Sequence, residues 1–142
     1  MIGSWLARGC MLVVLTLAGP AAGDLAEPDR AAIRSVIAAQ LAAFQADDGE
    51  RAFGFASPAI QQQFGTPSNF LAMVSTAYGP VYRPREVRFG DLAVVRGEPV
   101  QLVLLVGPDL EVVNAFYAMQ QQADGSWRIN GCILEPAADE AL

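Results

Sequence analysis

The amino-acid sequence predicts an α+β domain, in which amino-terminal helices pack on a curved four-stranded antiparallel sheet. Before residue 81 apolar residues recur three and four positions apart, and after it the period shifts toward two, with turn residues at short intervals. Helices that come before strands favour this class over a parallel α/β arrangement. We expect one domain over residues 24–136 and a disordered acidic tail over residues 137–142.

The first 23 residues have the pattern of a cleavable secretory signal peptide. Arg8 precedes an apolar run, residues 11–18, which ends before Pro20. This run is shorter than the roughly 20 apolar residues that a transmembrane helix needs. We therefore expect cleavage after Gly23 and a periplasmic or secreted mature protein with no membrane partner. An uncleaved amino-terminal anchor is the alternative.

Composition and charge exclude several classes of function. The chain has 9 Lys+Arg against 15 Asp+Glu, a balance that argues against a nucleic-acid partner. It contains no histidine, so neither a Ser-His-Asp triad nor a histidine-based zinc site can be built. We expect no metal and no cofactor. Cys132 is the single cysteine of the predicted mature domain, which rules out an internal disulfide bond.

The helical half begins with residues 28–46, where one apolar face is formed by Ile33, Val36, Ile37, Leu41 and Phe44. Asp48 is a candidate cap for a short helix over residues 49–56. In Ser57-Pro58 and Thr66-Pro67, a capping side chain precedes a proline that suits the first helical position. These pairs predict helices that reach residues 64 and 78, and Gly79-Pro80 is expected to end the last one.

Four strands are predicted, over residues 85–95, 100–106, 111–121 and 126–134. We expect a bulge at Gly90. The second strand has apolar residues on both faces, which is typical of a central strand. Trp127, Ile129 and Ile133 fall on one face under strict alternation, and this predicts that Trp127 is buried.

Three segments carry a resemblance to a known family. They are AYGPVYRPREVRF at residues 77–89, the apolar pattern of residues 32–64, and DGSWRI with the following Gly-Cys pair in residues 124–132. Over residues 29–134 the chain resembles an uncharacterised bacterial family, a domain of unknown function numbered four-eight-six-four. That family is similar to the nuclear transport factor two and ketosteroid isomerase superfamily. The resemblance implies a cone in which a bent sheet wraps a long helix around a cavity, but it implies no catalytic residues.

The candidate ligand-binding residues are Tyr78, Tyr82, Arg83, Asn114, Tyr117 and Asn130. The Tyr82 phenol lies next to the Arg83 guanidinium, which is able to grip a carboxylate through two hydrogen bonds. A structural interpretation is the alternative. In it, the Tyr82 ring packs, and Arg83 pairs with a surface acid.

The sequence leaves three functions open. The leading hypothesis is non-catalytic binding of a small or partly apolar ligand in the cone-shaped cavity. The second is a protein-interaction or homodimerisation module that uses the sheet face, because residues 100–106 are apolar on both sides. The third is a cofactor-free isomerase or hydratase of the ketosteroid isomerase kind, which needs a carboxylate base such as Asp91 or Glu111. Cys132 is a poor candidate nucleophile, because the chain has no histidine to activate it.

Overall fold

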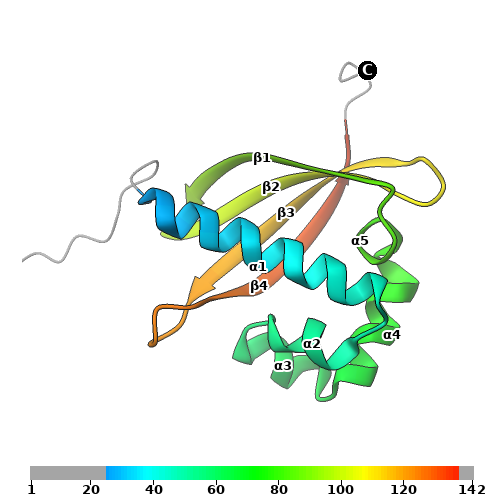
Figure 1. The fold of residues 1–142 in the computed structure, drawn as a ribbon, viewed down its shortest axis with the longest axis horizontal. Coiled ribbons are helices and arrows are strands. Elements are labelled where there is room, and N and C mark those ends of the chain that lie inside the picture. The colour runs from blue at the N-terminus through cyan, green and yellow to red at the C-terminus, as the bar shows by residue number, and fades with distance from the viewer. Residues whose placement is uncertain (1–24, 138–142) are drawn as a thin grey trace, which may run out of the picture.

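The computed structural model describes residues 25–137, so the predicted signal peptide and residues 138–142 of the predicted tail lie outside the described residues. Five helices come first: α1 (Glu27–Gln45), α2 (Gly49–Gly54), α3 (Pro58–Phe64), α4 (Pro67–Ala77) and α5 (Gly79–Tyr82). Four strands follow: β1 (Glu86–Val95), β2 (Glu98–Val106), β3 (Val112–Gln121) and β4 (Trp127–Pro136). The predicted α+β class is confirmed (Figure 1). Within residues 25–137, no helix has both the length and the apolar character to cross a membrane.

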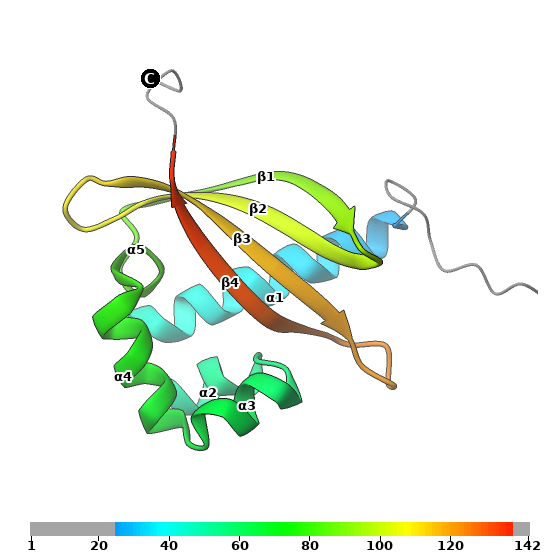
Figure 2. The ribbon, with the colours of Figure 1, turned by 180° about the vertical axis from the view of Figure 1, so that it is seen from behind.

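The strands form one sheet in the order β1-β2-β3-β4, and each strand is antiparallel to the next. The sheet curves, and the described helices all lie on one side of it (Figures 1 and 2). The long helix α1 runs obliquely across this inner face, while α2, α3 and α4 gather below the carboxyl-terminal half of α1 in the view of Figure 1. The helices therefore pack against the inner face only.

Local signals in the sequence determine where three helices begin. The Asp48 side chain accepts a hydrogen bond from the Arg51 backbone N–H at the start of α2. Ser57 Oγ accepts from the Ile60 N–H at 3.3 Å, and Thr66 Oγ1 accepts from the Asn69 N–H at 3.1 Å. These contacts satisfy backbone donors that have no partner within the first helical turn. The three predicted caps are confirmed.

The segment after α4 differs from the prediction. The helix α4 ends at Ala77, close to the predicted boundary, but Gly79 and Pro80 then begin another helical turn, α5. The backbone N–H groups of Val81 and Tyr82 both donate to the Tyr78 carbonyl at 2.9 Å. Proline is tolerated in a first turn because its missing N–H has no partner there. The same Gly-Pro pair therefore ends one helix and starts the next.

The core fills the space between α1 and the inner face of the sheet. Its fully buried side chains include Ile33 and Ile37 from α1, and Val103, Leu105 and Met119 from the strands. Trp127 is only 7% exposed, which confirms its predicted burial. Its indole Nε1 donates to Asp29 Oδ1 at 3.2 Å, and this bond ties the start of β4 to the first turn of α1.

Two β-bulges change which side chains face the core. The register shifts between Phe89 and Leu92, and this confirms the bulge predicted at Gly90. A second shift was not predicted: Met119 pairs with Ile129 and Ala118 pairs with Gly131, so Asn130 has no partner in the register.

The extra residue at Asn130 reverses the side-chain alternation of β4. Cys132 and Leu134 therefore face the core and pack against it, and Ile133 is 64% exposed on the outer face. The prediction that Ile133 shares a face with Trp127 is wrong. A strict period of two does not survive an inserted residue.

The outer face of the sheet is also apolar. Alternate residues of β2 and β3 form an outward-facing row that consists of Val100, Leu102, Leu104, Val106 and Phe116. No described helix covers this face (Figure 2). The predicted central strand, β2, is therefore apolar on both sides but covered on one side only.

Candidate functional site

A cavity of about 200 Å³ lies between the helices and the inner face of the sheet. Helices α1, α3, α4 and α5 contribute to its wall, and β3 and β4 complete it. Much of its surface is aromatic, from Phe44, Phe64, Phe70, Tyr78 and Tyr117. The cavity is partly open, so a small molecule has a route into it.

The aromatic wall is organised around Phe70 of α4. The Phe70 ring centroid lies 5.8 Å from that of Phe44, 5.5 Å from Phe53 and 5.6 Å from Phe64. The rings are tilted or edge-on to one another, as aromatic pairs prefer. The four rings come from helices α1, α2, α3 and α4. The packing of these helices therefore holds one side of the cavity in place.

The described residues that line this cavity include no Asp, Glu or Arg. The two acids considered as catalytic bases lie elsewhere: Asp91 is exposed at the bulge of β1, and Glu111 lies in the loop before β3 with its carboxylate against Gly107. An isomerase of the ketosteroid isomerase kind needs a carboxylate base at the substrate. This lining offers none.

Polar groups do reach the cavity wall at two neighbouring strand positions, Tyr117 of β3 and Cys132 of β4, which pair in the register. The Tyr117 hydroxyl is buried and has no hydrogen-bond partner among the described residues. The neighbouring Cys132 thiol interacts with the hydroxyl electrostatically. The Tyr78 hydroxyl donates to the Cys132 carbonyl at 3.3 Å.

Burial keeps both groups protonated near neutral pH. It raises the pKa of Tyr117 well above its ordinary value, and the neighbouring Cys132 adds to this effect. Burial also raises the pKa of Cys132 to about 12. The thiolate is the nucleophilic form of cysteine, so this position suits a wall residue and not a nucleophile.

Gln40 is a buried amide on the inner face of α1 that also lines the cavity. Its Nε2 donates to the Ala52 carbonyl at 3.1 Å, which fixes the orientation of the amide. Sequence reasoning missed this residue, although a signal existed: Gln40 lies between Ile37 and Phe44 at the spacing of the apolar face.

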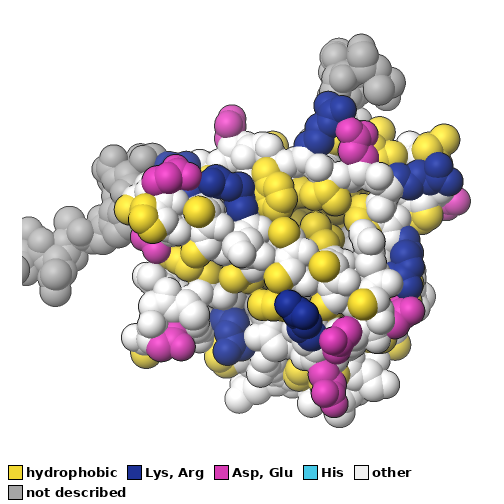
Figure 3. Space-filling view, in the orientation of Figure 1, with side chains coloured by type: hydrophobic (Ala, Val, Ile, Leu, Met, Phe, Trp, Pro, Cys, Tyr) yellow, Lys and Arg dark blue, Asp and Glu magenta, His cyan; other side chains and the backbone are white. Residues whose placement is uncertain are grey.

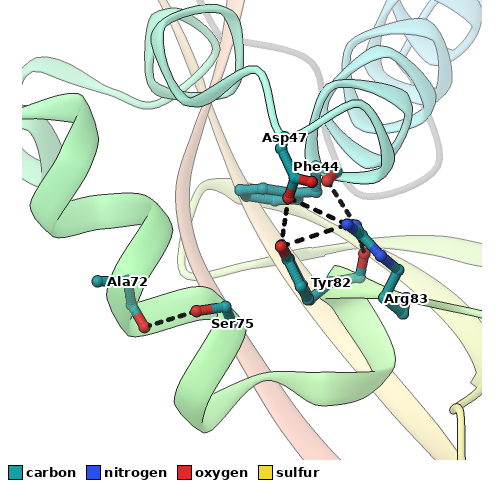
Figure 4. Close-up of polar contacts among 6 residues, drawn as sticks. All are labelled: Phe44, Asp47, Ala72, Ser75, Tyr82 and Arg83. Atoms are coloured by element: carbon teal, nitrogen blue, oxygen red, sulfur yellow. Dashed lines mark hydrogen bonds and ion pairs between the residues drawn. The ribbon is translucent and has the colours of Figure 1, made fainter.

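Tyr82 and Arg83 lie outside this lining, in a polar cluster with Asp47 at the end of α1 (Figure 4). Arg83 donates to the Phe44 carbonyl at 2.6 Å and to Asp47 Oδ1 at 3.0 Å, and the Tyr82 hydroxyl donates to the same carboxylate oxygen. The Arg83 Cζ lies 4.0 Å from the centroid of the Tyr82 ring. Asp47 adopts a positive φ of 53°, a conformation that Asp and Asn tolerate better than most residues.

This cluster supplies a hydrogen-bond donor to a backbone carbonyl at the carboxyl end of α1. The last carbonyls of a helix lack partners within the helix, and a cation near them also interacts favourably with the helix dipole. The hydrogen bond from Tyr82 and then that from Arg83 lower the pKa of Asp47, and the bond to Asp47 raises the pKa of Tyr82. The guanidinium thus has protein partners in the described structure.

The Asp47 contacts predict a pH dependence of stability. A carboxyl whose pKa is lowered by folding stabilises the protein above its unfolded pKa, and this contribution is lost as the pH falls through the folded pKa. Asp47→Asn tolerates the positive φ but removes the charge. We expect the wild-type protein to unfold at a higher temperature than this variant at pH 7, and the difference to shrink below the ordinary carboxyl pKa of 3.8. Thermal unfolding of both proteins from pH 7 to pH 3 measures it, and a difference that stays constant to pH 3 contradicts it.

The two candidate asparagines lie away from the cavity lining. Asn114 faces outward on β3, between Leu104 and Glu135 in the register. Asn130 occupies the bulge of β4, where its Oδ1 accepts from Ser57 Oγ at 2.7 Å and its Nδ2 donates to Glu98 Oε1 at 3.0 Å. Of the six residues suggested by the sequence, the structure brings Tyr78 and Tyr117 together at the cavity.

Fold and cavity together define a small α+β domain with an uncharged pocket between its helices and its sheet. The chain belongs to the family described as Domain of unknown function (DUF4864), whose model matches residues 26–142. This confirms the family indicated by the sequence. No curated protein and no solved structure matches the chain. The expected relationship to the nuclear transport factor two and ketosteroid isomerase superfamily therefore stays a prediction.

Proposed function

We propose that this domain binds a small, uncharged and largely apolar molecule in the cavity, without catalysis. The observation that carries the proposal is the lining itself, which is aromatic and aliphatic with a few polar groups and no charged side chain. Ligand sites in proteins are typically concave and apolar, with a small number of polar groups that orient the ligand. The carboxylate ligand considered from the sequence is not favoured, since Arg83 is engaged at the end of α1.

A cavity-filling substitution tests this proposal. Val74 of α4 is buried and lines the cavity, so Val74→Phe places a ring in the space that a ligand needs. We expect the purified wild-type protein to carry a compound that native mass spectrometry detects, or to be stabilised thermally by toluene or 4-methylphenol. We expect the variant to lose both properties and to keep its fold, because filling a cavity restores packing contacts.

Val87→Phe is the matched control, because Val87 lies outside the lining and is 36% exposed. This variant should retain the co-purified compound and the thermal response. A wild-type protein that carries no compound and responds to neither probe contradicts the proposed function. So does a Val74→Phe variant that binds as well as the wild type.

We propose further that the domain acts outside the cytoplasm, after cleavage of a signal peptide. The support is the sequence of residues 1–23, with Arg8 before a short apolar run that ends at Gly19 and Pro20. Expression of the full chain in a bacterium should give a mature protein that begins near Asp24. Cell fractionation should recover this protein in the periplasmic fraction. Intact mass and fractionation measure this outcome. A full-length chain that is found with the membranes would show that the segment is an anchor.

One observation favours a second candidate function, a homodimer formed through the sheet. The outward row of Val100, Leu102 and Leu104 on β2 is apolar and is not covered by any described helix (Figure 2). Exposed contiguous apolar surface often marks an interaction site. If two copies associate through this face, Leu104→Glu should convert a dimer into a monomer in light scattering, without loss of the cavity response. A wild-type protein that is monomeric at high concentration excludes this candidate.

A further inference from the structure

Helix α3 differs from the other described helices in how little of it is buried. None of its 7 residues is fully buried, whereas α1, α2, α4 and α5 each bury at least one side chain. Figures 1 and 2 place α3 at the outside of the molecule, beside β4. Segments with few buried apolar contacts are the ones that open locally at a low free energy. Of the described helices, α3 is therefore held least firmly by core packing.

The same helix forms one wall of the cavity. Ile60, Gln63 and Phe64 of α3 line it, and Gln63 is the only exposed residue in the described lining. Ile60 and Phe64 are partly buried and pack against the margin of the core. One side of α3 therefore faces solvent and the other faces the cavity, where fewer atoms are available for packing than in a filled core. The mouth of the cavity lies at α3, and displacement of this helix would widen it.

Two side-chain amides fasten α3 to its neighbours. Gln61 Nε2 donates to the Phe53 carbonyl at 2.9 Å and to the Ala56 carbonyl at 3.3 Å. Asn69 Nδ2 of α4 donates to the Phe64 carbonyl at 3.1 Å. Bonds of this kind contribute little net free energy, because both partners can form hydrogen bonds with water instead. They favour the observed position of α3 but can be exchanged for bonds to water.

The two ends of α3 have the features of a fixed point and a hinge. At the amino end, the Ser57 N–H donates to the Ile129 carbonyl at 2.8 Å and the Ser57 Oγ donates to Asn130 Oδ1 at 2.7 Å. At the carboxyl end, Gly65 has a φ of 79°, and no heavy atom lies within 4 Å of the position that a Cβ would take. Glycine adopts other φ and ψ values at little steric cost. A change at Gly65 can therefore turn α3 about its attachment to β4.

We propose that α3 is a gate, which moves between Ser57 and Gly65 to admit the ligand to the cavity and to release it. The helix contains no charged residue. Figure 3 shows positive and negative side chains interspersed on the face that α1 crosses, with no large patch of one sign. An uncharged entrance suits the uncharged ligand proposed above. This inference rests on the proposed function, because the gate serves the binding cavity, but the movement of α3 is measurable without a ligand.

The rate at which Cys132 is chemically labelled tests the gate. Cys132 lines the cavity, and burial raises the pKa of its thiol to about 12, so it should react slowly while α3 is in place. Cys10→Ser leaves Cys132 as the single cysteine of the full chain. In this background, 4,4′-dithiodipyridine, an uncharged thiol reagent, reports access to the cavity. Gln61→Ala removes both amide bonds and should raise the labelling rate about tenfold, because the closed position loses two hydrogen bonds.

Urea separates movement of α3 from unfolding of the whole domain. The urea dependence of an opening reaction scales with the surface that the reaction exposes. Movement of one short helix exposes little surface, so the labelling rate should depend only weakly on urea below the unfolding transition. A global loss of stability in Gln61→Ala would instead give labelling with the full urea dependence of unfolding.

Gln62→Ala is the matched control, because it makes the same chemical change one residue along α3, at an exposed side chain outside the lining. It should label at the rate of the parent protein. Equal rates for the two variants overturn the gate, and so does labelling of the parent protein only through global unfolding. Labelling without urea at the rate of the unfolded chain also overturns it, because the cavity would then be permanently open. A protein that carries no compound and responds to neither toluene nor 4-methylphenol contradicts the proposed function alone, since the labelling rates involve no ligand.

Discussion

Replacement of Trp127 by alanine is expected to destabilise the protein by about 3–5 kcal/mol, the range measured for deletion of a large buried aromatic side chain. Trp127 is 7% exposed, and it begins the strand that carries Cys132 into the cavity wall. Its ring joins the core beneath α1, and its Nε1 bond to Asp29 is the polar link between β4 and the first turn of that helix. Urea denaturation of both proteins measures the loss.

Two further variants separate packing from the hydrogen bond at this position. Trp127→Phe keeps an aromatic ring but removes the donor to Asp29, so it should cost clearly less than the alanine variant. Asp29→Leu removes the acceptor and leaves the ring in place. If Trp127→Ala costs less than about 1 kcal/mol, the ring contributes little to the core and the placement of β4 against α1 is wrong.

The parts of the fold that sequence reasoning predicted well are those that depend on neighbouring residues. The caps at Asp48, Ser57 and Thr66 involve a side chain and a backbone N–H three positions later, so the signal is local. The apolar face of α1 likewise follows from helical periodicity alone. Long-range packing then confirmed what these short patterns had indicated.

The bulge at Asn130 was not predictable in the same way. Nothing in the strand sequence forces an extra residue there, and the side chain of the extra residue contacts a residue 73 positions away, through the bond from Ser57 Oγ to Asn130 Oδ1. The Ser57 N–H also donates to the Ile129 carbonyl, so the N-cap residue of α3 is bonded to two consecutive residues of β4. This attachment accompanies the change of face that turns Cys132 inward and Ile133 outward.

The candidate site was predicted in part, for a related reason. Tyr78 and Tyr117 were selected as hydroxyl groups able to face a cavity, and both line it. Tyr82 and Arg83 were selected because they are adjacent in sequence, but their partners are Phe44, near the end of α1, and Asp47, in the turn that follows α1. The direction of a polar side chain depends on such tertiary partners, which one sequence without homologues does not reveal.

Phe44→Ala is the second change with a large expected effect, and it connects stability to binding. The Phe44 side chain is almost fully buried, stacks near Phe70 at 5.8 Å and forms part of the cavity wall. Its deletion should cost about 3–5 kcal/mol, because the lost ring leaves a void that joins the existing cavity and is not filled by relaxation. Urea denaturation measures this loss.

The same variant should bind larger molecules, because the lost ring enlarges a cavity that holds about 200 Å³ in the wild type. We expect 2-naphthol, a two-ring phenol, to stabilise Phe44→Ala in thermal unfolding and to leave the wild type unaffected. Phe53→Ala is the matched control: Phe53 also packs on Phe70, at 5.5 Å, but it does not line the cavity. This variant should lose stability without a gain in naphthol binding. If both variants respond equally to 2-naphthol, the ligand enters through general loosening of the core, and Phe44 does not define the size of the site.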